Sequence, residues 1–282
     1  MNLCPTIAVL HPMTSPTGVA LGSSAVAILG LMLTTWLISL ALKNASIVDI
    51  VWGLGFVLVA WVVRLRVDDG LPARQWLLVG MTTLWGLRLA IHLWRRNHGQ
   101  GEDFRYRAMR KRWGARFPFV SLFTVFLLQG TLMWIVSLPV QVGQVDPTPG
   151  LGLIALAGVA VWMCGLFFET VGDAQLAAFK RNPANAGLVM NTGLWRYTRH
   201  PNYFGDACVW WGIGLVAIET ATAWWTLIGP LVMTVFLVRV SGVALLERSL
   251  TKRKPGYEQY VAETSAFIPR RPKRTDSVSS SG

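Results

Sequence analysis

The stretch FVSLFTVFLLQGTLMWIVSLPVQ at residues 119–141 contains no charged side chain. A helix needs about 20 mostly apolar residues to cross the hydrocarbon core of a bilayer, and this stretch has that length. Six further runs of this kind flank it, and we predict a membrane span in each: 19–42, 47–66, 75–94, 151–172, 203–222 and 224–245. The sequence therefore predicts an all-α membrane protein, built as a bundle of seven transmembrane helices.

The composition of the whole chain supports this class. Of the 282 residues, 53% are hydrophobic and 14% are charged, whereas about 25% are charged in a typical soluble domain. A disordered chain and an ordinary soluble enzyme are therefore excluded. The three cysteines are Cys4, Cys164 and Cys208. Two of them lie inside apolar runs and none has metal-ligand spacing, so we predict neither a disulfide framework nor a metal site.

The basic residues alternate between the two sides of the predicted spans. Of the 26 Lys and Arg residues, eight lie in the connection 95–118, and others follow the first, fifth and seventh spans. The opposite connections hold only Arg64, Arg66 and Arg74. Because cytoplasmic connections carry the excess of positive charge, we predict the N-terminus outside and the C-terminus in the cytoplasm.

The net charge of +12 is thus first a topology signal. It also favours contact with anionic lipid head groups. Nucleic-acid binding is not expected, because the basic runs are short, adjoin spans and match no nucleic-acid module. The predicted partners are membrane lipids and a lipid-soluble small-molecule substrate, with no obligate protein partner.

No internal repeat or separate soluble domain is evident. We predict an N-terminal segment 1–18, one membrane domain 19–268 and a basic, disordered tail 269–282. The residues before the first span carry no Lys or Arg, so they lack the basic region of a cleavable signal peptide, and that span is expected to remain. The predicted location is a multi-pass position in the bacterial inner membrane, or in the endoplasmic reticulum of a eukaryote.

Ionisable side chains inside a predicted span are informative, because hydrocarbon makes them costly unless they face a cavity or a partner. Arg88 and His92 lie four residues apart at one end of the third span. For both, an interior role and snorkelling of the side chain to the membrane interface are equal alternatives. Arg239 lies deep within the seventh span, and we expect it to be buried against a partner.

Two acidic residues close the fifth span. Glu169 and Asp173 lie four residues apart, which places both carboxylates on one helix face. Lys180 extends that face by a further heptad. The neighbouring residues are apolar, so placing two carboxylates among them costs free energy, which a functional role would explain. The alternative is a solvated helix end without such a role. Asp49, at the start of the second span, fits either a functional acid or an N-cap-type residue.

The densest polar cluster is GLWRYTRHPNYFGD at residues 193–206. Pro201 disfavours helical geometry at His200 and suits the first turn of the sixth span. The free N–H groups of that helix start, close in sequence to Arg196 and Arg199, suit a phosphate or another anion. The other polar side chains of the cluster are Tyr197, Asn202, Tyr203 and Asp206. We predict a functional site in this segment.

Two motifs carry a resemblance to a known family. RYTRHPNYFGD (196–206) and PGYEQYVAETSAFIP (255–269) resemble the steroid 5α-reductase superfamily, and more closely its bacterial DUF1295 branch. Further segments look like that branch: IVDIVWG (47–53), WGLRL (85–89), EDFRYRAMRKRWG (102–114) and FETVGDAQLAAFK (168–180). The resemblance covers most of the chain, and from about residue 150 it extends to the steroid reductases themselves.

The resemblance implies seven transmembrane helices that hold NADPH in a cytoplasm-facing cavity and reduce a carbon–carbon double bond conjugated to a carbonyl. It implies cofactor contacts at six positions of this chain: Glu169, Asp173, Lys180, Asn202, Asp206 and Arg239. Glu169 departs from the reductase pattern, which has a carboxamide at that position. The cluster residues Tyr197, Arg199, His200 and Tyr203 complete the predicted cofactor site.

An enone acceptor also needs a donor that stabilises its developing enolate oxygen. In the reductases a Glu and a Tyr of the N-terminal half supply it, and no position here matches them directly. Our candidates are Tyr106 and Glu102, with Asp49 in reserve. The alternative for residues 102–114 is an amphipathic helix whose charges face solvent. No GxGxxG follows a strand, so a dinucleotide site would not be of the Rossmann type.

Two other functions remain open from the sequence. The RHPNY and GYEQY motifs are shared in looser form with isoprenylcysteine and phospholipid methyltransferases, which bind S-adenosylmethionine in a similar helical site. The acidic face of the fifth span and the count of seven spans favour the reductase. A transporter or channel is the third possibility, and the lack of internal repeats disfavours it.

Overall fold

The computed structural model describes residues 15–219, 223–240, 247 and 255–273. These residues are helical or irregular, and no strand occurs among them. The chain divides into two compact units. Unit 1 comprises residues 1–155 and 213–229, and unit 2 comprises residues 156–212 and 230–282, each within the limits of the described residues.

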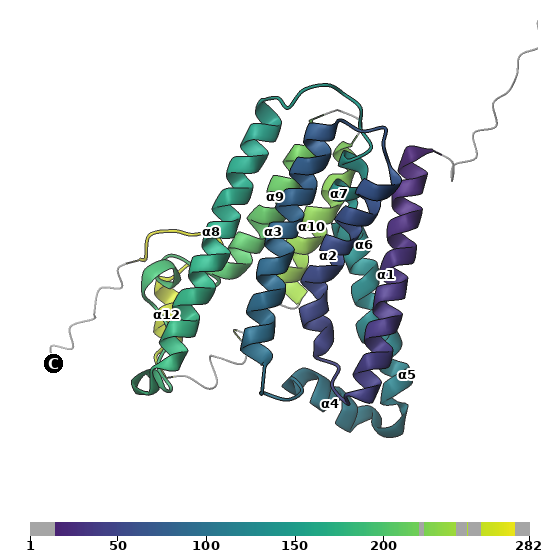
Figure 1. Ribbon diagram of the computed structural model, residues 1–282. Helices are drawn as coiled ribbons and strands as arrows, with labels where there is room; N and C mark the ends of the chain where they lie inside the picture. Colours follow the sequence, from purple (N-terminus) through teal and green to yellow (C-terminus); the bar gives the residue numbers. More distant parts are fainter. Residues whose placement is uncertain (1–14, 220–222, 241–246, 248–254, 274–282) are drawn as a thin grey trace, which may run out of the picture. The chain divides into compact units, whose positions relative to one another are not determined.

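Three long helices begin unit 1. They are α1 (Pro16–Ala41), α2 (Ile47–Arg66) and α3 (Pro72–Asn97). Figure 1 shows them side by side, with α2 packed along α3. Gly53 and Gly86 allow this packing, because a Cβ at Gly53 would lie 2.5 Å from the carbonyl oxygen of Gly86. Small residues of this kind let two membrane helices approach each other at backbone distance.

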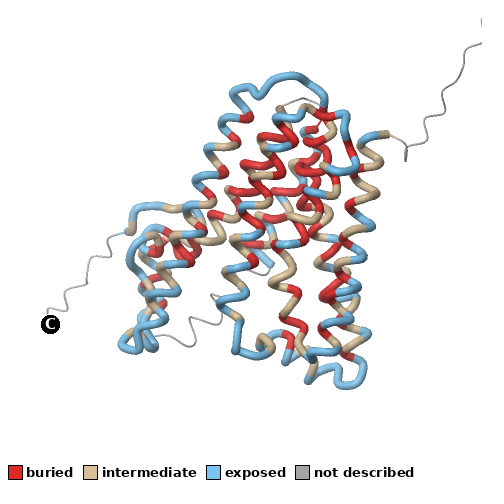
Figure 2. The backbone as a smooth tube through the Cα atoms, in the orientation of Figure 1, coloured by how far each residue is buried: buried red, intermediate tan, exposed pale blue. Residues whose placement is uncertain are grey.

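The helices of unit 1 expose many apolar side chains. On α1, Val26, Leu29 and Leu37 are exposed, whereas Ile28 and Met32 are buried. Figure 2 shows this alternation of buried and exposed residues along the helix. An outward apolar surface on a long helix is the pattern of a helix solvated by lipid.

The predicted fourth span is a broken helix rather than a continuous one. It runs through α5 (Phe117–Ser121), η2 (Leu122–Leu127), α6 (Leu128–Val136) and α7 (Leu138–Gly143), and α4 (Phe104–Trp113) and η1 (Gly114–Arg116) precede it. Pro118 and Pro139 stand at the starts of α5 and α7. Proline has no backbone N–H, but at a helix start that N–H would have no partner within the helix. The η2 turn is a π-helix, a feature frequent at functional sites.

A fully buried arginine fixes the loop that follows α7. Arg74, in the first turn of α3, donates hydrogen bonds to the carbonyl oxygens of Asp146 at 3.1 Å, Thr148 at 3.2 Å and Gly150 at 3.3 Å. Its Nη1 also lies 3.6 Å from Oδ1 of Asp146. Four contacts from one guanidinium satisfy a charge that would otherwise be costly to bury.

Unit 2 contains most of α8 (Leu153–Arg181) and of α9 (Pro201–Ala217). Its other segments are η3 (Pro183–Asn185), η4 (Gly193–Arg196), η6 (Phe236–Val240), α12 (Tyr257–Glu263) and the later part of α10 (Ile228–Val235). The two long helices approach at glycines, since a Cβ at Gly165 would lie 2.5 Å from the carbonyl oxygen of Gly205. This close approach places the first turn of α9 against the acidic face of α8.

The predicted spans agree with the observed helices for the first five. Among the described residues, five helices are long and apolar enough to cross a membrane, with Phe104–Val136 counted as one. The protein is therefore an integral membrane protein. The sixth predicted span is the 17-residue α9, and the seventh is the shorter apolar helix Trp224–Val240, which runs through η5 (Trp224–Leu227), α10 and η6. The count of seven and the orientation of the termini stay predictions.

Candidate functional site

A tyrosine and an aspartate from separate helices form a hydrogen-bonded pair in unit 1. The hydroxyl of Tyr106 on α4 donates to Oδ1 of Asp49 on α2 at 2.8 Å. The amide Nε2 of Gln129 on α6 donates to the same hydroxyl at 3.4 Å, and Nη2 of Arg105 lies 2.9 Å from Oδ2 of Asp49. Tyr106 is only 6% exposed. The structure thus brings two of the three predicted catalytic residues together.

Local chain geometry explains how this pair forms. Ser46 is the residue that precedes α2, so Asp49 stands in the first helical turn and is not the N-cap. A carboxylate in that turn is stabilised by the N-terminal end of the helix dipole. Asp103 caps α4 by accepting the Arg105 N–H at 2.9 Å, and its own N–H donates to Oγ of Ser46 at 2.6 Å. This contact ties the start of α4 to the start of α2.

Glu102, the third predicted catalytic residue, has a different environment. Its carboxylate accepts the N–H of Ala45 at 2.8 Å and two hydrogen bonds from Arg110, at 2.8 Å and 3.0 Å. Partial burial opposes ionisation of this carboxyl, but the bonds from Arg110 and Ala45 outweigh it and hold its pKa below the usual value. Glu102 therefore stays ionised and joins α4 to the turn after α1, which makes it a poorer proton donor than Tyr106.

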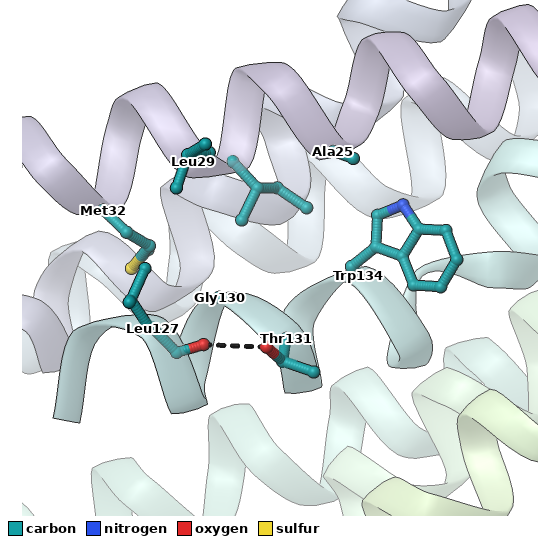
Figure 3. Close-up of a pocket in the computed structure, with 8 residues that line it drawn as sticks. Ala25, Leu29, Met32, Leu127, Gly130, Thr131 and Trp134 are labelled. Carbon is teal, nitrogen blue, oxygen red and sulfur yellow. Dashed lines mark hydrogen bonds between the residues drawn. The ribbon is translucent and has the colours of Figure 1, made fainter. Parts of the chain in front are cut away.

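An apolar cavity of about 260 Å³ lies between α1 and α6 in unit 1 (Figure 3). Ile28, Leu29 and Met32 line it from α1, and Thr131 and Trp134 line it from α6. The Thr131 hydroxyl donates to the carbonyl oxygen of Leu127 at 2.9 Å, so its polarity is satisfied within the helix. The cavity therefore presents mainly hydrocarbon.

In unit 2 the acidic face of α8 meets the start of α9. Glu169 and Asp173 are both buried. The amide Nδ2 of Asn202 donates to Oδ1 of Asp173 at 3.2 Å. Gly205 lies against Glu169, because a Cβ there would be 2.7 Å from the Glu169 backbone nitrogen. The α9 helix begins at Pro201, as the sequence predicts. The structure thus brings together three residues of the predicted cofactor site.

A second cluster in unit 2 centres on Glu247. Its Oε1 lies 2.8 Å from Nε of Arg199 and 3.3 Å from Nε2 of His200. The His200 ring stacks on Tyr203, with 5.4 Å between the ring centroids. Burial opposes ionisation of Glu247, but hydrogen bonds from His200 and Arg199 outweigh it and lower its pKa to about 2. No sequence pattern marks Glu247, because it belongs to no motif and follows the last predicted span.

Arg199 also ties the chain that follows α12 to this cluster. Its guanidinium donates to the carbonyl oxygens of Val261, at 3.0 Å, and Thr264. Its backbone N–H donates to the carbonyl oxygen of Ser265 at 2.9 Å. The motifs 196–206 and 255–269 are therefore in direct contact within unit 2.

The remaining residues of the predicted cofactor site differ in how far they are exposed. Lys180 and Tyr197 are exposed, and Asp206 is half-buried on α9. Arg239, which we expected to be buried, has an exposed side chain on the π-helical turn η6. The turn explains the difference, since a wider helical turn rotates a residue away from the face that regular helical spacing assigns to it.

Comparison with known proteins gives one family and one relative. Residues 35–264 match the family described as "Protein of unknown function (DUF1295)". The chain is 23% identical to the uncharacterized protein C594.04c of Schizosaccharomyces pombe, over 83% of this chain and 75% of the yeast protein. No solved structure matches. Since the family match spans well over half of the residues, and the segments that carry the Tyr106–Asp49 pair and the acidic α8 face both lie inside it, this chain belongs to the DUF1295 family.

Proposed function

We propose that the protein is a membrane reductase that uses NADPH to reduce a carbon–carbon double bond conjugated to a carbonyl in a lipid-soluble substrate. The observation that carries the proposal is the buried hydrogen bond from Tyr106 to Asp49, which holds a tyrosine hydroxyl in a fixed position inside a membrane protein. DUF1295 proteins are related to steroid 5α-reductase-like proteins, which supports the same reaction class.

The proposed reaction assigns a defined task to Tyr106. NADPH, when bound, supplies a hydride to the β-carbon of the enone, and the electron pair of the double bond moves onto the carbonyl oxygen. When the substrate binds, the Tyr106 O–H turns from Asp49 to that oxygen and stabilises its developing negative charge, and Arg105 keeps its contact with Asp49. Asp49 holds the hydroxyl in position before the substrate binds, and a proton from solvent then reaches the α-carbon, so that one hydride and one proton are added across the double bond.

The cofactor is assigned to residues of unit 2 by the chemistry of their groups. Glu169 and Asp173 offer acceptors for the hydroxyl groups of a ribose or for a carboxamide N–H, and Asn202 offers both a donor and an acceptor. The exposed cations Lys180 and Arg196 suit the phosphates of a dinucleotide. The donor set therefore fits a phosphorylated dinucleotide, and the cationic side chains favour NADPH over NADH.

The surrounding lipid and the apolar cavity support one substrate class. A cavity of about 260 Å³ lined by α1 and α6 suits hydrocarbon rather than a polar metabolite. Gln129 lies on the same helix, α6, and contacts Tyr106, so this helix connects the cavity wall with the catalytic pair. A lipid-soluble enone is the substrate class that these contacts support.

The test is a thermal-shift titration of the purified protein in detergent with NADPH, NADH and S-adenosylmethionine. A ligand at 100 times its dissociation constant adds about 2.7 kcal/mol to the free energy of unfolding. We expect stabilisation by NADPH and its loss in Asn202→Ala, with Asn191→Ala as the matched control on an exposed residue of the same unit. Stabilisation by S-adenosylmethionine alone would replace the reductase with a methyltransferase.

A further inference from the structure

A second cavity in unit 1, of about 210 Å³, lies where the turn between α1 and α2 meets the end of α3. We name it the head-group cavity. Its walls include Asn44, Ser46, Trp94, Asn97, His98 and Gly101. None of the residues that line it is acidic, and it contains neither a predicted cofactor residue nor a predicted catalytic residue.

The two asparagines present hydrogen-bond donors to this cavity. Oδ1 of Asn44 accepts the N–H of Ser46 at 2.9 Å, and Oδ1 of Asn97 accepts Nε–H of Arg96 at 3.1 Å. Their acceptor atoms are thus engaged, and within the described residues no hydrogen bond uses either Nδ2. His98 adds a ring N–H, and its ring lies 5.4 Å from that of Trp94. The two Nδ2 groups and the ring N–H of His98 are therefore donors that a ligand can use.

Arginines and acids both flank the cavity in sequence, and Asp49, between the lining residues Ile47 and Ile50, is paired with Arg105. Arg95 and Arg96 end α3, and both acids of the following loop already have partners. Glu102 binds Arg110, and Asp103 binds Arg105 at 2.9 Å. An anion in the cavity therefore meets donors and positive potential without an opposing unpaired carboxylate.

The loop that closes the cavity leaves room for a ligand. Gly99 and Gly101 have φ angles of 75° and 71°, which only glycine adopts readily. A Cβ at either position would meet no atom within 4 Å, so the space beside this backbone is open.

The position of the cavity identifies its ligand class. Trp94 is 53% exposed at the end of the span α3, next to two arginines. Tryptophan and arginine together mark the level of the lipid head groups. We propose that the head-group cavity binds a phosphate ester anion, supplied by the head group of an acidic phospholipid. A soluble phosphate ester has the same anionic group and is the second source that the experiment distinguishes.

The experiment measures binding and needs no enzymatic turnover, so it is independent of the proposed reductase activity. The full-length protein is placed in nanodiscs that contain phosphatidylcholine with phosphatidylglycerol, and the lipids retained after extraction are counted by native mass spectrometry. In parallel, inorganic pyrophosphate is titrated into the detergent-solubilised protein in a thermal-shift assay.

Each variant adds a negative charge to the cavity wall. His98→Glu changes an exposed loop residue and is expected to fold, and Asn97→Asp replaces a donor with a carboxylate. Asn191→Asp makes the same charge change at an exposed position of unit 2 and is the matched control. We expect the wild type and the control to retain phosphatidylglycerol with about a tenfold preference, and both cavity variants to lose it.

Each outcome decides the assignment. Stabilisation of the wild type but not of His98→Glu by pyrophosphate would support the phosphate site and identify a soluble ligand as its source. Equal retention of phosphatidylglycerol by the wild type and both cavity variants, all eluting as folded protein and none responding to pyrophosphate, would overturn the proposal.

Discussion

At the scale of single residues, the hydroxyl of Tyr106 and the carboxylate of Asp49 form the contact on which the proposed chemistry depends. Arg105 neutralises the charge of Asp49 from the other side, at 2.9 Å, and Gln129 approaches the hydroxyl from α6. A tyrosine whose hydroxyl contacts residues of two other helices loses little orientational entropy when a substrate binds. Removal of the hydroxyl alone is therefore the sharpest probe of its role.

We predict that Tyr106→Phe keeps the fold and loses turnover. The ring and its packing remain, whereas a positioned general acid contributes about 100-fold or more to the rate. Reduction of an enone by NADPH should fall by at least about 100-fold, and NADPH affinity should stay within about twofold. Tyr257→Phe, which removes a hydroxyl from a buried tyrosine of unit 2, is the control and should retain activity. Equal activity of Tyr106→Phe and wild type would remove Tyr106 from the mechanism.

Glu247 gives unit 2 a predicted acid sensitivity. Its pKa in the folded protein is about 2, below the ordinary value of 4.5, because Arg199 and His200 stabilise the carboxylate. Its contribution to stability is therefore complete above pH 4.5 and is lost as the pH falls from 4.5 toward 2. Glu247→Gln should lower the free energy of unfolding at pH 7 by about 2 kcal/mol.

Thermal melts of the wild type and of Glu247→Gln across this pH range check the prediction. The difference between their melting temperatures should shrink as the pH falls, because protonation removes in the wild type the charge that the substitution removes in the variant. Glu258→Gln changes an exposed carboxylate of α12 and should leave the melting curves unchanged. A constant difference at every pH would assign the effect to packing.

The residue scale also shows how much of the site the sequence could predict. Tyr106, Glu102 and Asp49 were all identified as candidates, but only coordinates separate the first and last, which contact each other, from Glu102, which binds Arg110. Glu247 could not be predicted, because its role depends on contacts with His200 and Arg199, which precede it in the chain by 47 and 48 residues. Side-chain pairing over such separations leaves no local pattern.

At the scale of the helix, close glycine contacts decide how two elements pack. A Cβ at Gly165 of α8 would lie 2.5 Å from the Gly205 carbonyl oxygen and 2.6 Å from the Val209 nitrogen. Both neighbours are backbone atoms, so α8 and α9 would have to separate. We predict that Gly165→Ala lowers the free energy of unfolding by about 2 kcal/mol.

Gly80→Ala is the matched control, since a Cβ at Gly80 in the middle of α3 meets no atom within 4 Å. It should be neutral or stabilising by up to about 1 kcal/mol, because alanine favours the helix. Denaturation of both variants in a mixed-detergent titration provides the comparison. Similar stabilities for Gly165→Ala and Gly80→Ala would show that α8 and α9 are not closely packed in solution.

The interruptions of the fourth span could not be predicted from hydropathy. Hydropathy predicts a continuous span over 119–141, whereas the helical stretch in the structure is Phe104–Val136 and contains a π-helical turn. Pro118 and Pro139 mark two of the breaks, but the π-helical turn Leu122–Leu127 contains neither proline nor glycine. An extra residue in a helical turn changes the rotation of the chain and not its composition, so hydropathy does not detect it.

At the scale of the whole molecule, five and seven spans have one consequence in common. Either number is odd, so both place the two termini on opposite sides of the membrane. The distribution of Lys and Arg predicts a cytoplasmic C-terminus. Fluorescent-protein fusions at the C-terminus should therefore fluoresce, and alkaline phosphatase fusions there should be inactive. The opposite result would reverse the predicted orientation.

A fusion after residue 219 distinguishes the two counts. If α9 crosses the membrane, alkaline phosphatase attached there is exported and active, and if it does not, the fusion stays in the cytoplasm. A fusion after Asn185 is the control, because that position is cytoplasmic in the predicted topology with either count. An inactive fusion after residue 219 beside an active C-terminal one would contradict both the span count and the orientation.

Arg74 also has a consequence for how the chain is made. Its nearest hydrogen-bond partner, the carbonyl oxygen of Asp146, lies 72 residues later in the chain. At a synthesis rate of about 5–20 residues per second, the ribosome takes roughly 4–14 s to add those residues. For that interval the nascent α3 holds a guanidinium whose final partners have not yet been translated. The third helix can therefore settle into its final position only after the loop that follows α7 has left the ribosome, which couples the timing of translation to membrane insertion.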